Sequence, residues 1–347
     1  MAVKNKKIIL IGETYSKRTD FFLRAAKELG ISVNFYAWSE WKKCDIEGGV
    51  VKIDPPSFKE YNIMSLPEII QDYKNNLYEL EQLSKKKEIH FLNSPSDILQ
   101  LLDKSACKKH LSKSNITVTE MITDNLNDYS ELKELMLSKK IKSVFVKPMY
   151  GSGAAGIIAL SLNPANKKIL AYTAAVFDGD VLFQQKRIRK ITDEKEIEKI
   201  VNAVASLGVI VERWYSKAAL NGNAFDFRVV WQFGCIEYIV ARKSSTPITN
   251  LHLNNGAVLF DEILERKESW NTGNILNNIE QLCNSAMMLY PNTRVAGLDV
   301  MLDKKSGKPR IIEINGQGDL LYQDIYKDNL IYRNQIIHMN KICDIAE

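Results

Sequence analysis

The pattern of apolar residues changes near residue 115, and this change constrains the fold more than any single motif. Before it, an apolar strand at Lys6–Gly12 is followed by an amphipathic helix at Arg18–Leu29, which ends at Gly30, and by a strand at Ile31–Tyr36. A strand, a helix and a strand in this order predict a small parallel α/β unit. The helical spacing of apolar residues in Pro67–Lys87 predicts a long helix after it.

Beyond residue 115, strands follow one another at short intervals. A short strand at Ile89–Leu92 and two short helices within Ser94–Lys113 lead up to this region. Helices are expected at Asp128–Lys139, Asp193–Leu207 and Asn274–Tyr290, and strands at Lys142–Lys147, Ile157–Ser161, Val181–Lys186, Val209–Arg213, Ala224–Phe233, Ile236–Arg242, Arg294–Leu302 and Pro309–Asn315. Helices kept apart from antiparallel strands predict an α+β region. The 347 residues suit two domains or a little more, with a boundary expected at 95–125.

Composition and charge exclude several classes of protein. The 47 basic and 42 acidic side chains leave a net charge of +5, without a basic stripe that would predict a nucleic-acid partner. No apolar run approaches the about 18 residues of a membrane helix. The five cysteines are far apart and form no Cys-x-x-Cys motif, so neither a zinc site nor a disulfide framework is expected. We therefore expect a cytoplasmic protein in which any metal is held by oxygen atoms.

The sharpest chemical signal is a hairpin near the C-terminal end, formed by Arg294–Leu302 and Pro309–Asn315. A turn about Ser306-Gly307 places Asp299 opposite Glu313, because both lie seven residues from position 306. Side chains directly opposite each other on antiparallel strands are about 5 Å apart. The sequence therefore predicts two carboxylates side by side.

The same hairpin predicts a metal site. Because strand side chains alternate, Glu313 and Asn315 are expected on one face, with Ile312 and Ile314 on the other. Two carboxylates beside an amide oxygen repel each other unless a divalent cation lies between them, and an all-oxygen set of few ligands suits Mg²⁺. A surface hairpin with ordinary charges is the alternative, but Glu313 interrupts an otherwise apolar run.

A glycine-rich loop follows a strand that ends in Lys147-Pro148. The loop contains Gly151, Gly153 and Gly156, and another strand begins directly after it. Glycines allow backbone N–H groups to turn toward an anion, and Lys147 adds a positive charge. The loop is not a P-loop, because it lacks Gly-Lys-Ser/Thr and leads into a strand. A phosphate flap and a glycine-rich hairpin that binds nothing both remain open.

Three weaker patterns accompany these two. An apolar strand runs into Glu212-Arg213-Trp214, where backbone groups and aromatic rings suit an adenine, although a core strand reaching the surface is the simpler reading. Asp226 and Arg228 share a face near Arg242, and paired arginines stabilise phosphoryl groups; an exposed ion-paired face is the alternative. Asp103-Lys104 lies at a helix junction, where a plain solvated lysine is the simpler reading.

In this order, the five patterns resemble the ATP-grasp superfamily, most specifically the RimK-like amino-acid ligases, and more distantly D-alanine–D-alanine ligase and biotin carboxylase. The resemblance covers roughly residues 93–320 and rests on the whole set of patterns. It implies an ATP-grasp fold with an N-terminal α/β domain at 1–95. A central subdomain with the glycine-rich flap at 96–210 and a C-terminal subdomain with the metal site at 211–347 would follow.

The resemblance also implies roles for individual residues. Catalysis would fall to Arg228 and Arg242, which would face the γ-phosphate and the acyl-phosphate. One or two Mg²⁺ ions, with Mn²⁺ as an alternative, would be held by Asp299, Glu313 and Asn315. ATP would be bound by Lys104, Lys147, the flap residues Gly151, Ser152, Gly153 and Gly156, the hinge residues Glu212, Arg213 and Trp214, Asp226 near the ribose, and Asn250 in a Thr-Asn-Leu-His stretch.

Three departures from the RimK-like pattern concern the substrates. Ile248 stands where the pattern has a basic residue before the Asn250 stretch, and the segment between the hinge and Asp226 is longer than expected. After Asn315, the chain runs through Gly316–Tyr326 instead of a loop that contains Pro-Gly. Substrate identity is therefore not transferred by this resemblance.

The resemblance implies an ADP-forming carboxylate–amine ligase that acts through an acyl-phosphate. A thiol of a carrier protein or a hydroxyl as acceptor, and a nucleotide-binding regulatory protein without turnover, are the alternatives. The expected partners are a small carboxylate and an amine, with a carrier protein or peptide left open. Neither nucleic acid nor a membrane is expected, and a homodimer is left open. The loop Gly12–Arg18 follows a parallel strand, where ligands often bind, although a solvated loop is the simpler reading.

Overall fold

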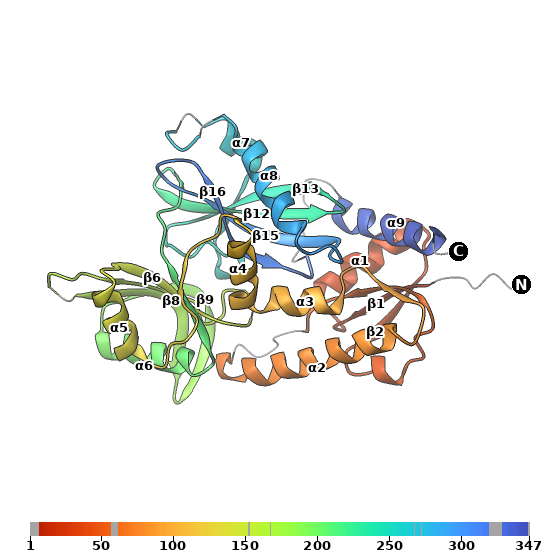
Figure 1. Cartoon of the computed structure of the whole chain (residues 1–347), viewed down its shortest axis with the longest axis horizontal. Helices are drawn as coiled ribbons and strands as arrows, with labels where there is room; N and C mark the ends of the chain where they lie inside the picture. Colours follow the sequence, from red (N-terminus) through yellow and green to blue (C-terminus); the bar gives the residue numbers. More distant parts are fainter. Residues whose placement is uncertain are drawn as a thin grey trace, which may run out of the picture.

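In the residues that it describes, a computed structural model of the chain shows three β-sheets, each built from a different stretch of the sequence (Figure 1). It describes residues 7–56, 62–151, 153–166, 168–266, 268–271, 273–318 and 328–345. A parallel sheet comes first and two antiparallel sheets follow, so the predicted ATP-grasp combination of α/β and α+β architecture is confirmed. Within the described residues, no helix combines the length and apolar character needed to cross a membrane.

The first sheet is parallel, with strand order β2-β1-β3-β4. The two central strands, β1 and β3, are buried at every position, as is typical of strands covered on both faces. Helix α1 begins where the Ser16 hydroxyl accepts a hydrogen bond from the backbone N–H of Arg18. The elements are β1 (Ile8–Gly12), α1 (Lys17–Glu28), β2 (Val33–Ala37), β3 (Gly49–Ile53), α2 (Leu66–Ser84) and β4 (Ile89–Phe91); β3 was not predicted from the sequence.

The C-terminal helix α9 (Leu330–Ile345) packs on this first sheet beside α1 (Figure 1). The ring of Tyr332 meets that of Phe22 edge-on, with 6.1 Å between their centroids. The sequence analysis assigned no helix here, although the buried residues Tyr332, Ile336 and Met339 recur at helical spacing. The end of the chain therefore stabilises the domain with which the chain begins.

The second sheet is antiparallel, with strand order β5-β10-β6-β7-β8-β9. The two short helices predicted within Ser94–Lys113 are confirmed as α3 (Pro95–Leu102) and α4 (Lys104–Lys113), which lead into it. Helices α5 and α6 contribute to its apolar core. The elements are β5 (Met121–Thr123), α5 (Tyr129–Ser138), β6 (Ser143–Pro148), β7 (Ile158–Leu162), β8 (Ile169–Asp178), β9 (Val181–Ile191), α6 (Glu194–Ala205) and β10 (Val209–Arg213).

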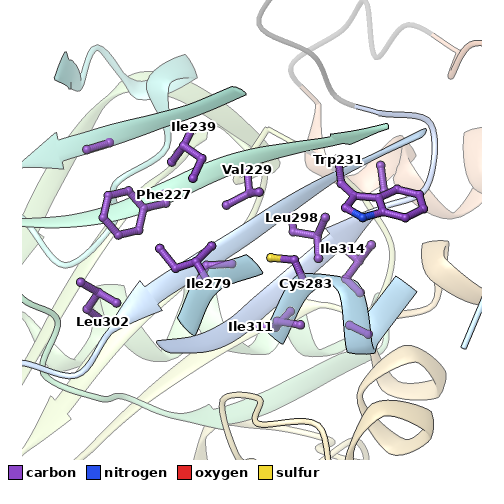
Figure 2. Packing of buried hydrophobic residues seen from close by; sticks show 14 of the residues in the cluster. Phe227, Val229, Trp231, Ile239, Ile279, Cys283, Leu298, Leu302, Ile311 and Ile314 are labelled. Atoms are coloured by element: carbon purple, nitrogen blue, oxygen red, sulfur yellow. The ribbon is translucent and has the colours of Figure 1, made fainter. Parts of the chain in front are cut away.

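The third sheet is antiparallel, with order β14-β13-β12-β15-β16, and a short strand β11 pairs with β12. Figure 2 shows how its buried face packs: Ile279 and Cys283 of α8 lie against Val229 and Leu298 of the strands. The elements are β11 (Ala219–Leu220), β12 (Asn223–Gln232), β13 (Cys235–Ser244), β14 (Gly256–Leu259), α7 (Phe260–Leu264), α8 (Ile275–Met287), β15 (Val295–Leu302) and β16 (Pro309–Asn315). On the opposite face, Asp226, Arg228 and Asp299 line a cavity, whereas Val230 and Val295 pack against the first sheet.

The hairpin of β15 and β16 corrects one expectation. Asp299 is paired with Glu313, as predicted, but the next pair is Val300 with Ile311, so Ile312 is the extra residue of a β-bulge. Ile311 and Ile314 therefore lie together in the core. The expectation that Ile312 and Ile314 share a face was wrong, because the bulge interrupts the alternation of the strand.

Candidate functional site

A cavity of about 890 Å³, counting the solvent at its mouth, lies between the second and third sheets. The lining side chains include six cations and four anions, so its walls carry a net charge of +2, which favours an anionic ligand. Most residues singled out from the sequence border this one space: Lys104, Lys147, Gly151, Gly153, Glu212, Arg213, Asp226, Arg228, Arg242, Asn250, Asp299, Glu313 and Asn315.

At one end of the cavity, the buried carboxylate of Glu212 lies between two lysines. Glu212 Oε2 is 3.0 Å from Lys147 Nζ and accepts a hydrogen bond from the Thr119 hydroxyl at 2.7 Å. Glu212 Oε1 is 3.4 Å from Lys108 Nζ. Burial alone would raise the pKa of Glu212, but Lys108 and Lys147 hold that pKa below its usual value. We call Glu212, Lys147, Lys108 and Thr119 the hinge cluster.

The other end of the cavity is a row of charges across the third sheet. Strand register places Asp226 opposite Arg242, Arg228 opposite Asp299, and Asp299 opposite Glu313. Arg242 Nε donates to Asp226 Oδ1 at 2.8 Å, and Arg228 Nε donates to Asp299 Oδ1 at 2.7 Å. A second nitrogen of Arg242 lies 3.0 Å from Asp299 Oδ2. We call these five residues the charged row.

Two residues that the sequence analysis missed, Lys217 and Thr249, contact the charged row at Asp226. Lys217 Nζ donates to Asp226 Oδ2 and to the Thr249 hydroxyl, both at 2.8 Å, and the Thr249 hydroxyl also donates to Asp226. Burial lowers the pKa of Lys217, while Asp226 opposes that change. Lys217 lies outside any periodic segment, and only its closeness to the hinge strand in the sequence pointed to it. Asp226 is thus surrounded by donors from three segments.

The glycine-rich loop connects β6 and β7, and its residues Gly151, Gly153, Ala154 and Ala155 line the cavity. Lys104 Nζ donates to the Gly151 carbonyl at 2.7 Å, and the Tyr150 hydroxyl donates to Asp103 Oδ2 at 2.7 Å. Gly153 has a φ of +67°, a conformation that favours glycine. Ser152 lies outside the described residues.

Two predicted nucleotide contacts are not on the cavity wall. A Cβ atom on Gly156 would lie 2.9 Å from Pro148 Cγ, so this glycine allows the loop to pack on the strand before it. The ring of Trp214 packs on Phe145, with 5.5 Å between centroids, and it is Phe145 that lines the cavity. Gly156 and Trp214 therefore pack behind Pro148 and Phe145, which line the cavity in their place.

The predicted metal ligands suit a hard cation that takes its remaining ligands from a phosphate. Asn315 Nδ2 donates to the Gly297 carbonyl at 3.2 Å, which leaves the amide oxygen to accept. Glu313 Oε1 is 3.5 Å from Lys104 Nζ. Among the described residues no three His, Cys, Asp or Glu side chains gather as a metal cluster. Two opposed carboxylates and an amide oxygen fit Mg²⁺, which takes its other ligands from water and phosphate.

The sequence profile of the family described as YheC/D like ATP-grasp matches residues 89–334, more than two thirds of the chain. The chain belongs to the YheC/D-like ATP-grasp family. The matched stretch contains the hinge cluster, the glycine-rich loop and the charged row. It confirms membership of the ATP-grasp superfamily without specifying a RimK-like subtype. ATP-grasp ligases use ATP with Mg²⁺, the chemistry for which these residues are suited.

Solved ATP-grasp structures share this fold at low sequence identity. D-cycloserine synthetase DcsG has a TM-score of 0.59 at 11% identity, over 95% of this chain and 98% of that chain. Macrocyclase MdnC from Microcystis aeruginosa MRC, bound with precursor peptide MdnA, has a TM-score of 0.61 at 9% identity, over 96% and 100%. D-alanine–D-alanine ligase from Bacillus anthracis has a TM-score of 0.55 at 14% identity, over 99% and 100%. A comparison with curated proteins gave no match.

Proposed function

We propose that this ATP-grasp protein is an ADP-forming ligase that activates a carboxylate as an acyl-phosphate and joins it to an amine. The observation that carries this proposal is the charged row, in which two arginines and two opposed carboxylates face the same cavity as the hinge cluster. Phosphoryl transfer depends on holding the nucleotide in line and on neutralising charge at its γ-phosphate. A cavity with cations at both ends, Lys147 at one and Arg228 and Arg242 at the other, supports both functions.

In the first step, a carboxylate oxygen of the substrate attacks the γ-phosphorus of ATP, and the bond to the β,γ-bridging oxygen breaks to release ADP. Lys104 and Lys147 bind the phosphates, and Arg228 and Arg242 neutralise the transferring group. Bound Mg²⁺, in one or two copies on Asp299, Glu313 and Asn315, supplies further charge neutralisation.

In the second step, the amine attacks the acyl carbon, the carbon–oxygen bond to phosphate breaks, and the amine loses a proton. Arg228 and Arg242 stabilise the negative charge on the tetrahedral oxygen. The loop Gly151–Gly156 keeps water from the acyl-phosphate, which would otherwise hydrolyse. Glu212 and Arg213 of the hinge, with Asn250 and Asp226, position the nucleotide. Trp214 supports this wall through its packing on Phe145.

The proposal assigns the domains as predicted, with the N-terminal domain at 1–95, the central subdomain at 96–210 and the C-terminal subdomain at 211–347, from which α9 returns to the first sheet. The structural neighbours are named for small substrates and for a precursor peptide. We propose that the acceptor amine belongs to an amino acid or a peptide. A cytoplasmic location and a homodimer remain predictions.

Product analysis with Mg-ATP tests the proposal. The protein is incubated with and without a pool of free amino acids and short peptides, and the nucleotide products are separated. We expect ADP and phosphate that appear only with the pool, and Arg228→Met as a matched inactive control. AMP and pyrophosphate would contradict the acyl-phosphate mechanism. Bound ATP without turnover would instead favour a carrier-protein acceptor or a regulatory role.

A further inference from the structure

Lys108 is a buried lysine outside the cavity wall, and the proposed mechanism does not use it. It lies on α4, and its side chain is 5% exposed. Burial lowers its pKa, while Glu212 opposes that change. Moving an ammonium group out of water is costly unless oxygen atoms replace its hydration. Its partners therefore indicate what the protein gains from placing a charge here.

The Lys108 ammonium contacts three segments that are far apart in the sequence. Its Nζ donates to the Thr119 hydroxyl at 2.6 Å and to the Ile312 carbonyl at 2.9 Å, and it lies 3.4 Å from Glu212 Oε1. Thr119 precedes β5, Glu212 is on the hinge strand β10, and Ile312 is on β16. One positive charge thus connects the hinge cluster to a strand of the third sheet.

The contact with Ile312 is made at the bulge of β16. Pro309 to Ile311 pair with β15 in one register, and from the pair Asp299–Glu313 onward the register is shifted by one residue. If the first register continued without the bulge, Asp299 would be opposite Ile312 instead of Glu313. The carbonyl of a bulged residue loses its ladder partner, and Lys108 supplies a donor to it.

We propose that Lys108 is a positioning residue that couples the nucleotide hinge to the metal-binding strand. By binding Glu212 on one side and the bulge carbonyl of Ile312 on the other, it fixes the distance between the hinge cluster and Glu313. This inference rests on the proposed nucleotide and metal site, and it adds a residue that does not line the cavity. Loss of Lys108 changes nucleotide affinity and Mg²⁺ dependence together, because both depend on one ammonium group.

The test measures ADP binding to the full-length protein by calorimetry, with and without Mg²⁺. Lys108→Met keeps the aliphatic stem and removes the charge. Lys109→Met is the matched control, because Lys109 is the next residue on α4, half-exposed and paired with Asp124 away from the cavity. We expect Lys108→Met to weaken ADP binding about tenfold and to reduce the additional affinity gained with Mg²⁺. Lys109→Met is expected to match the wild type in both.

A purely structural role for Lys108 would lower the melting temperature but leave the affinity of the folded protein and its Mg²⁺ gain unchanged, and that result would overturn the inference. Thr119→Val provides a second test that does not depend on the fold of Lys108→Met. It removes the hydroxyl shared by Lys108 and Glu212 but keeps the ammonium on Ile312, so ADP binding should weaken while the Mg²⁺ gain persists. Unchanged ADP affinity in Thr119→Val would contradict the coupling to the hinge. Wild-type protein that bound no ADP would refute the nucleotide site itself.

Discussion

The hinge cluster and the charged row both bury ions at the same cavity, but they assemble them differently. In the charged row, Asp226 and Arg242, and likewise Arg228 and Asp299, occupy directly opposite positions on adjacent strands, so the antiparallel register creates these contacts. Arg242 also reaches past β12 to Asp299. In the hinge cluster, Lys108, Lys147 and Thr119 come from three separate segments and meet at Glu212. The comparison teaches that one end of the site follows from strand pairing, whereas the other depends on how separate segments pack.

The two ends also differ in how strongly their charges depend on one another. Arg242 contacts both Asp226 and Asp299, so a single guanidinium serves two carboxylates. Glu212, by contrast, has two lysines and a hydroxyl for one carboxylate. We therefore expect the charged row to be sensitive to the loss of a cation, and the hinge cluster to tolerate such a loss better.

The largest expected effect is on stability, from Arg242→Met. This change leaves two buried carboxylates short of a partner, which should destabilise the fold by about 3–5 kcal/mol. Denaturant unfolding measures the change, with the exposed Arg266→Met as a control expected within about 0.5 kcal/mol of the wild type. A loss as small as that of the control would mean that Lys217 and Arg228 compensate, and the contrast between the two ends would disappear.

Glu313→Gln is expected to reduce turnover by about 100-fold or more while leaving the fold intact. The amide keeps the shape of the side chain but cannot neutralise the charge of a cation bound between residues 313 and 299. ADP formation under the product assay measures the loss, and circular dichroism checks the fold. Glu262→Gln on α7 is the control. Near-normal turnover in Glu313→Gln would remove Glu313 from the metal site.

Lys147→Met sharpens the comparison at the hinge end. We expect ATP affinity to fall by about tenfold, because the variant loses the positive charge that Lys147 places beside the nucleotide. The fold should lose less stability than in Arg242→Met, since Glu212 keeps Lys108 and Thr119. Calorimetry and denaturant unfolding measure the two effects, with Lys142→Met as control, because Lys142 is exposed and lies just before β6. Equal stability losses in Lys147→Met and Arg242→Met would show that the hinge is no more tolerant.

The smallest expected effect is on how steeply the stability of the fold declines in acid. Despite burial, Arg242 and Lys217 hold the pKa of Asp226 well below its usual value, so its ionisation stabilises the fold above about pH 4. That contribution is lost as the pH falls through the folded-state pKa. Asp226→Asn should lower the melting temperature at neutral pH but flatten its decline as the pH falls below about 4 toward the folded-state pKa of Asp226. An equally steep decline in the variant would assign the acid sensitivity to other carboxylates.

The hairpin illustrates both the strength and the limit of reasoning from the sequence. Counting from Ser306 placed Asp299 opposite Glu313, and the structure confirms the pair. The count succeeds only because the bulge at Ile312 shifts the register by one residue. Alternation is a local property that a sequence shows, but a bulge depends on what satisfies the extra backbone groups, here a lysine from another part of the chain.

The missed elements have similar explanations. Strand β8 contains several small residues, among them Ala171, Ala174 and Ala175, which are buried but give a weak apolar pattern. Helix α9 had a helical pattern that was overlooked, whereas its packing on the first sheet is a tertiary contact. Lys217 and Thr249 lie in loops without periodicity, so only the folded arrangement brings them to Asp226.

By itself, the sequence determined that Asp226 and Arg228 share a strand face, that short helices lie within Ser94–Lys113, and which oxygen-bearing and basic residues gather into ATP-grasp patterns. These properties depend on neighbours within a few residues, which any reading of the chain includes. The tertiary structure alone decided that Lys108 meets a carbonyl 204 residues away, that Arg242 serves two carboxylates, and that Trp214 supports the cavity wall from behind. Such contacts arise because burial forces distant polar groups to satisfy one another, and sequence spacing carries no record of that pairing.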